Sequence, residues 1–210
     1  MTISRMGSAL AAVAAFLFCY VGNARAQGPQ PDLSSIKQIA IDTEIPQPEI
    51  PLIQSPGSFK AFMIGGGIGV ATNQQSAGKV FREYMRNNNI DISKIVYESF
   101  KRVIEEDKTF SLGEGANADA KLKLTINSYG FGAAGLFGGN ERRPLVNITA
   151  VLVSNSGDVV RKKTDYITNL SKLTEAYTYD QLAESPQLTK KSFEQVSVLL
   201  SRQILSDLKR

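Results

Sequence analysis

The chain has 210 residues, with 24 Lys or Arg, 20 Asp or Glu, no histidine and a single cysteine. Without histidine it lacks the commonest general base and metal ligand, and one cysteine supports neither an internal disulfide nor a Cys-ligated zinc site. These counts exclude His-dependent hydrolases and cysteine-based metal centres.

The first 26 residues have the three parts of a secretory signal. Arg5 gives a positive start, residues 6–21 are almost entirely apolar, and residues 24–26 (Ala-Arg-Ala) offer a small-x-small cleavage site. The apolar run ends at residues 22–23 (Gly-Asn), short of the about 20 apolar residues that a membrane-spanning helix needs. We therefore expect residues 1–26 to be cleaved and the protein to be exported.

Cleavage after residue 26 would remove Arg5 and Arg25 and leave 184 residues with 22 basic and 20 acidic side chains, a net charge of +2. That length suits one domain with a sizeable core. Cys19 lies inside the signal and is preceded by bulky residues rather than a small one, so we expect no lipid anchor there. We expect residues 27–35 to be flexible and residues 36–210 to form a single α/β domain.

The first half of this domain begins with isoleucines among polar residues over 36–45, which predicts a strand. Four prolines over 46–56 then predict an extended connection without regular pairing. Residues 76–86 are a predicted helix. The clearest helix covers residues 91–107, with Asn89 or Asp91 as its N-cap. Its side chains at i, i+3, i+4 and i+7 form one stripe, made of Ile92, Ile95, Val96, Ser99, Phe100, Val103 and Ile104.

The second half contains three predicted strands and a long helix. Residues 118–130 alternate between apolar and polar, typical of a strand with one wet face. Residues 144–154 are apolar on both sides and predict a central strand. A turn at 155–158 leads to a more charged strand at 159–168, near an edge. A short helix is expected over 178–184.

The last predicted helix runs from Pro186, which suits a first helical turn, to about Leu208. Its expected stripe is Phe193, Val196, Leu199, Leu200, Gln203, Ile204 and Leu208. The fold class is therefore α+β (or α/β): a single mixed sheet of about four to five strands packed against two long amphipathic helices.

Motifs for chemistry are absent or incomplete. The glycine cluster at residues 65–69 and Gly78-Lys79 do not complete a phosphate loop or a dinucleotide fingerprint. Basic residues are scattered, and residues 161–163 (Arg-Lys-Lys) are better explained as a solvated strand than as a nucleic-acid surface. We expect no enzyme activity, no catalytic residue, no cofactor and no metal. A His-free carboxylate hydrolase acting on an envelope polymer and a small-ligand or lipid carrier remain alternatives.

Two uncharged, glycine-rich, apolar segments stand out, at residues 62–70 and 129–139. Either both fold against the domain, with glycines permitting close backbone approach, or they form an exposed patch that docks a partner subunit or a membrane surface. On the second hypothesis the partner-binding residues are Phe62, Ile64, Ile68, Tyr129, Phe131, Leu136 and Phe137.

Three features together carry a resemblance: the helix at 92–104, the segment 118–122 (Ala-Asp-Ala-Lys-Leu), and the turn at 156–160 (Ser-Gly-Asp-Val-Val). Over about residues 36–170 the chain resembles periplasmic envelope-assembly domains of the curli secretion-channel family and related outer-membrane assembly lipoproteins. The resemblance implies a small non-catalytic module on the periplasmic side of an envelope complex, with no active-site residue. Those proteins typically carry a lipid-anchored N-terminal cysteine, whereas Gln27 stands in that place here.

The sequence therefore predicts an exported, non-catalytic interaction or assembly module of the cell envelope, periplasmic or associated with the outer membrane. Its expected partner is an envelope protein or a second copy of the chain. Peripheral contact with a membrane surface is a further expectation, membrane insertion is the weakest version, and nucleic acid is not expected.

Overall fold

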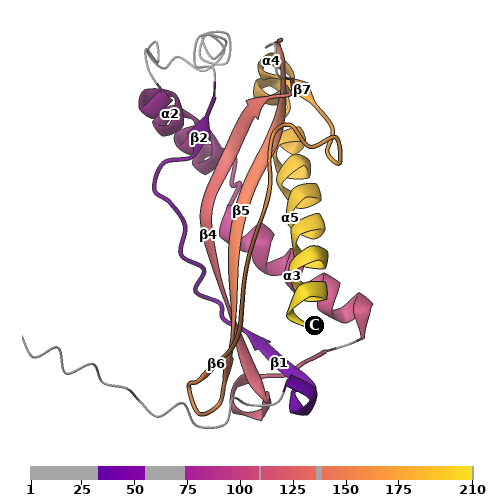
Figure 1. Cartoon of the computed structure of the whole chain (residues 1–210). Helices are drawn as coiled ribbons and strands as arrows, with labels where there is room; N and C mark the ends of the chain where they lie inside the picture. The colour runs from indigo at the N-terminus through magenta and orange to yellow at the C-terminus, as the bar shows by residue number, and fades with distance from the viewer. Residues whose placement is uncertain (1–32, 55–73, 109, 136–138, 210) are drawn as a thin grey trace, which may run out of the picture.

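The computed structural model describes residues 33–54, 74–108, 110–135 and 139–209. They form one mixed sheet with the helices packed against it (Figure 1), in the strand order β3-β1-β4-β5-β6. This confirms the predicted α+β class. In the described part of the chain, no helix is long and apolar enough to span a membrane.

Three antiparallel strands make up most of the sheet: β4 (Ala120–Ala133), β5 (Glu141–Ser154) and β6 (Val159–Ile167). β5 lies between the other two, and β6 is at an edge. The β5–β6 turn contains Gly157 with φ 90°, a conformation that favours glycine. The central and edge positions predicted from sequence are therefore confirmed.

The N-terminal strand predicted over 36–45 is shorter than expected, and a second short strand follows it; both run parallel to β4. β1 (Gln38–Ile41) lies between β4 and β3 (Ser111–Leu112). β2 (Leu52–Ile53) also pairs with β4, opposite Gly130 and Phe131. The expectation of no regular pairing over residues 46–56 is thus wrong at two residues. Leu52 and Ile53 each have a backbone N–H that can donate to a neighbouring strand, and Gly130 lets β2 approach β4 closely. The neighbouring prolines have no N–H, so the strand stays short.

The longer helices are α2 (Gln74–Asn87), α3 (Ile92–Asp107) and α5 (Pro186–Leu208), with the short α4 (Tyr179–Glu184) before α5. The Asp91 carboxylate caps α3 by accepting from the amides of Ser93 and Lys94 at 2.9 and 3.2 Å. Lys108 ends the helix in a left-handed conformation. All seven predicted stripe residues of α3 are buried. Three minor elements complete the structure: η1 (Leu33–Ser35), η3 (Gly115–Asn117) and β7 (Tyr177–Thr178).

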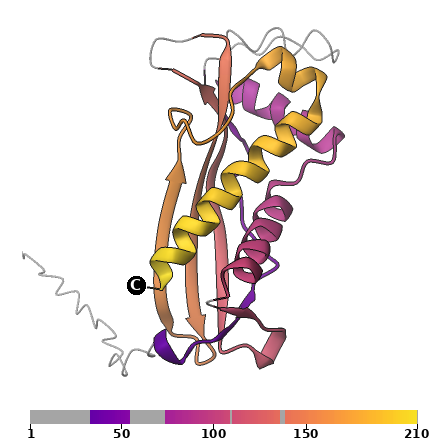
Figure 2. The same ribbon diagram turned by 90° about the vertical axis from the view of Figure 1, so that its right-hand side faces the viewer.

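The core lies between one face of the sheet and the two long helices. α3 and α5 pack on each other and lie across that face (Figure 2). α5 also contacts β5 and β6. Because α5 touches both α3 and the sheet, its buried surface differs from a simple stripe. Leu205 is buried, whereas Leu199 is only partly buried and Gln203 is exposed.

The opposite face of the sheet carries polar side chains. On β4, Lys121, Lys123 and Asn127 are exposed, which confirms the predicted wet face. The Asn127 amide donates to Asn147 and to Thr149, both at 2.8 Å. This face is therefore hydrophilic and held together by hydrogen bonds between strands.

Candidate functional site

The two glycine-rich segments join the described structure at the same end of the sheet. The amide of Gln54, the last described residue before 55–73, donates to the carbonyl of Phe131 at 3.0 Å. β4 ends two residues later at Ala133, and the chain resumes strand structure at Glu141. Segments 55–73 and 136–138 therefore begin from adjacent strands, although 76 residues separate Gln54 from Gly130 in sequence.

Tyr129 and Phe131 do not line an exposed surface. They are 4% and 0% exposed, and their rings lie 6.2 and 5.2 Å from that of Phe193 on α5. The cause is an irregularity in β4 between Ile126 and Ser128, which shifts the side-chain alternation by one residue. Both residues then face the helices, so for these two the buried hypothesis is correct and the exposed one is wrong.

The other five proposed partner-binding residues lie outside the described residues: Phe62, Ile64, Ile68, Leu136 and Phe137. The strand predicted over 118–130 also extends further than expected, because residues 131–133 belong to β4 as well. The glycine-rich segment at 129–139 is thus divided between a buried strand end and the connection that follows it.

Two arginines at the start of β5 hold this connection in place. Arg142 is 1% exposed, and its Nη1 donates to the carbonyls of Gly139 and Glu141 at 2.6 and 2.8 Å. Arg143 donates from Nη1 to the carbonyl of Ala134 at 2.7 Å. The backbone on both sides of residues 136–138 is therefore bonded to side chains of β5. Sequence reasoning missed these residues; an Arg pair directly before an apolar strand was the only signal.

Tyr179 on α4 packs against the same arginine. The guanidinium carbon of Arg142 lies 4.8 Å from the centre of the Tyr179 ring, a cation–π contact. The Tyr179 hydroxyl donates to the carbonyl of Gln54 at 3.2 Å. Burial raises the pKa of Tyr179 to about 12, although the nearby Arg142 acts in the opposite direction. Tyr179 thus stays neutral at physiological pH and ties α4 to the end of β2.

A loop that follows β6 also bonds to this end of the sheet. The Asn169 side chain donates to the carbonyl of Ala133 at 2.6 Å. Asn169 also packs over Gly132, where a Cβ would lie 2.5 Å from its Cγ. The sheet end is therefore built mainly from side chains that bond to backbone carbonyls. This arrangement fixes chain geometry and offers no activated nucleophile.

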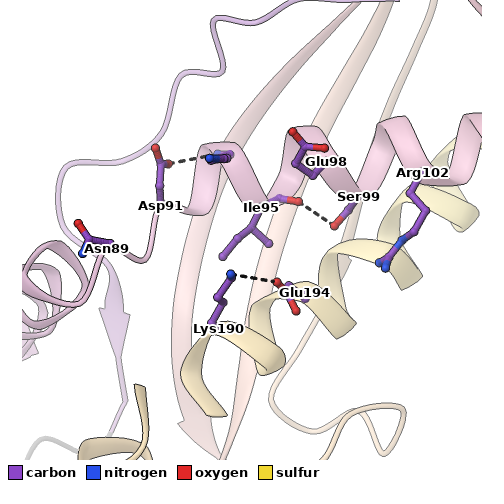
Figure 3. A pocket seen from close by; sticks show the side chains of 9 residues that line it. Asn89, Asp91, Ile95, Glu98, Ser99, Arg102, Lys190 and Glu194 are labelled. Atoms are coloured by element: carbon purple, nitrogen blue, oxygen red, sulfur yellow. Dashed lines mark hydrogen bonds and ion pairs between the residues drawn. The ribbon is translucent and has the colours of Figure 1, made fainter. Parts of the chain in front are cut away.

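A groove of about 370 Å³ lies elsewhere, between α3 and α5 (Figure 3). Ile95 and Arg102 point toward α5, whereas Glu98 points away from it. The hydroxyl of Ser99 donates to the carbonyl of Ile95 at 2.7 Å, so it is bonded within its own helix. Glu194 lies 3.8 Å from Lys190. The groove contains charges of both signs but no pair of facing carboxylates. Nor do the described residues contain any group of three or more potential metal ligands.

No family model and no curated protein matches the sequence. Among solved structures, the chain is similar to a minor lipoprotein from Acinetobacter baumannii, with 12% identity, a TM-score of 0.39, and 83% of this chain and 91% of that chain covered. It is also similar to lipoprotein GNA1162 from Neisseria meningitidis, with 14% identity, a TM-score of 0.26, and 77% of this chain and 98% of that chain covered. A dodecamer of PelC from Paraburkholderia phytofirmans matches with 14% identity, a TM-score of 0.30, and coverage of 79% and 87%. The chain thus has a distant structural resemblance to bacterial envelope lipoproteins.

Proposed function

We propose that this protein is an exported, non-catalytic interaction module of the cell envelope, which docks its partner through the glycine-rich segment 62–70 and the connection that follows β4. The observation that supports this is the pairing of β2 with the end of β4, because it attaches both uncharged segments at one end of the sheet. The bonds from Arg142 and Arg143 give the connection between β4 and β5 a fixed base. Fixed attachment lowers the entropic cost of binding a partner.

The docking role is tested by a double substitution in the second segment, Leu136→Ser with Phe137→Ser. The matched control is Leu170→Ser with Leu173→Ser, since these leucines are 48% and 63% exposed and lie outside both segments. In cells, we expect crosslinking to trap the wild type and the control in a larger complex, and the segment variant to remain free. A wild-type protein that stays uncrosslinked and monomeric in its native envelope would contradict the proposal.

Export is tested separately by the N-terminal sequence of the protein recovered from its native host. We expect the mature chain to begin at Gln27, and cell fractionation to place it outside the cytoplasm. Finding residues 1–26 still attached to protein in the cytosol would contradict export without bearing on the docking surface.

A further inference from the structure

Among the described residues, no strand lies beside the outer edge of β6. β6 pairs only with β5, from Val153↔Val159 to Val146↔Ile167. Among the described residues, no backbone hydrogen bond from a loop reaches β6 from the other side. An unpaired strand edge presents backbone donors and acceptors to which another extended segment can add. β6 is therefore a nine-residue template for one more strand.

The charges on this edge favour an acidic occupant. β6 contains Arg161, Lys162 and Lys163 against a single acid, Asp165, a net charge of +2. Lys163 is paired with Asp207 of α5 at 2.5 Å. Arg161 and Lys162 are exposed and form no ion pair with a described residue. They are the cations available to an incoming strand.

These two cations project from opposite faces of the sheet. Arg161 is paired in register with Leu152, on the side covered by helices, and Lys162 with Val151, on the polar side. On the polar side, Lys123 flanks Val151 from β4 and adds a second positive charge. Two adjacent residues of an added strand point to opposite faces of the sheet. One of them would therefore lie near Arg161 and the other near Lys162.

We propose that the outer edge of β6 binds an extended segment of a partner protein that contains two adjacent acidic residues between β-branched ones. A second copy of this chain does not suit the edge, because two β6 strands of charge +2 would lie side by side. This site is distinct from the glycine-rich segments. The chain would therefore have two separate contacts, one at the end of the sheet and one along its side.

The probe is a fluorescein-labelled ten-residue peptide of alternating valine and threonine around two central glutamates. The control peptide has proline in place of each valine, which keeps the charge but cannot form a regular ladder. We expect fluorescence anisotropy to show binding of the first peptide only. Hydrogen exchange at backbone amides within residues 159–167 should slow when that peptide is added.

The charge contribution is tested with Arg161→Gln plus Lys162→Gln, compared with Lys79→Gln plus Lys94→Gln, which removes the same charge from exposed positions on α2 and α3. The loss of two cross-strand charge pairs predicts about tenfold weaker binding for the β6 variant, equal to about 1.4 kcal/mol in total. The α2/α3 variant should bind as the wild type does. Circular dichroism melts establish that both variants remain folded.

Three results would overturn the proposal: no binding of the valine peptide, equal binding of both peptides, or strand-edge self-association of the protein without peptide in analytical ultracentrifugation. Equal binding would mean attraction to any polyanion. The Leu136→Ser, Phe137→Ser variant should bind the peptide normally. A failure of peptide binding at β6 is therefore distinguishable from a failure of the docking role proposed for the glycine-rich segments.

Discussion

Gly130 is the residue on which the pairing of β2 depends. Its φ is 152°, and a Cβ placed there would lie 1.8 Å from the carbonyl oxygen of Leu52. Gly130→Ala must therefore push β2 away from β4. We expect a loss of about 3 kcal/mol in the free energy of unfolding, from backbone strain and overpacking together, measured by urea denaturation.

Gly115→Asn is the matched control for this substitution. Gly115 has φ 53°, and nothing lies within 4 Å of a Cβ built there. Asparagine tolerates the left-handed region, so the substitution should lower the free energy of unfolding by less than about 1 kcal/mol. Equal losses at the two positions would show that close approach to β2 is not what requires Gly130.

Tyr179 makes the free energy of unfolding depend on pH in the alkaline range. Its pKa is about 12 in the folded protein, because it is buried, and 10.0 is its ordinary value. Between these values the unfolded chain loses the proton and the folded protein keeps it, so stability falls as pH rises above 10. Relative to Tyr179→Phe, the wild type should lose about 1.4 kcal/mol between pH 8 and pH 11.

Urea denaturation of both proteins at the two pH values measures this effect. Burial also raises the pKa of Tyr84 and of Tyr129, so some alkaline destabilisation should persist in the variant. The informative quantity is the change with pH in the difference between wild type and variant. A difference that is the same at pH 8 and pH 11 would contradict the assignment to Tyr179.

At the scale of single elements, the start of α3 depends on the Asp91 cap. Asp91→Ala removes both hydrogen bonds to the amides of Ser93 and Lys94. We expect a loss of about 1 kcal/mol in unfolding free energy, typical of an N-cap. Asp91→Asn keeps an acceptor oxygen and should recover most of it. If both variants are equally destabilised, capping is not the role of this side chain.

The elements also show what sequence reasoning can reach. The period of α3 predicted every buried residue of its stripe, because a single helix face meets a single core. The β4–β5–β6 order followed from alternation and turn chemistry. β2 could not be predicted, since its pairing depends on Gly130 lying opposite it in space, and proline content argued against a strand.

The candidate site was harder to predict than the fold. The irregularity near Ser128 has no signal in the sequence, yet it decides that Tyr129 and Phe131 face the core. Glycine content alone left open whether the segment is buried or exposed. Arg142 was also missed, because a nearly fully buried arginine that bonds to backbone carbonyls has no local sequence pattern. Neither the strand irregularity nor the burial of Arg142 can be read from the neighbouring sequence.

At the scale of the whole molecule, a single core joins the sheet to α2, α3 and α5. We expect one cooperative unfolding transition for residues 36–210, because the sheet and the helices share this core. Tyrosine fluorescence and far-ultraviolet circular dichroism should give the same midpoint in urea. Separate midpoints would mean that the chain contains more than one folding unit.

The parallel pairing of β1 with β4 has a consequence for how the chain is made. The carboxylate of Asp119 accepts from the amide of Gln38, 81 residues earlier in the chain. A ribosome releases Gln38 long before Asp119 exists, so the apolar face of β1 waits for its partner while the nascent chain grows. Distant pairings of this kind slow folding, and during that delay the isoleucines of β1 are available to chaperones that hold unfolded chains.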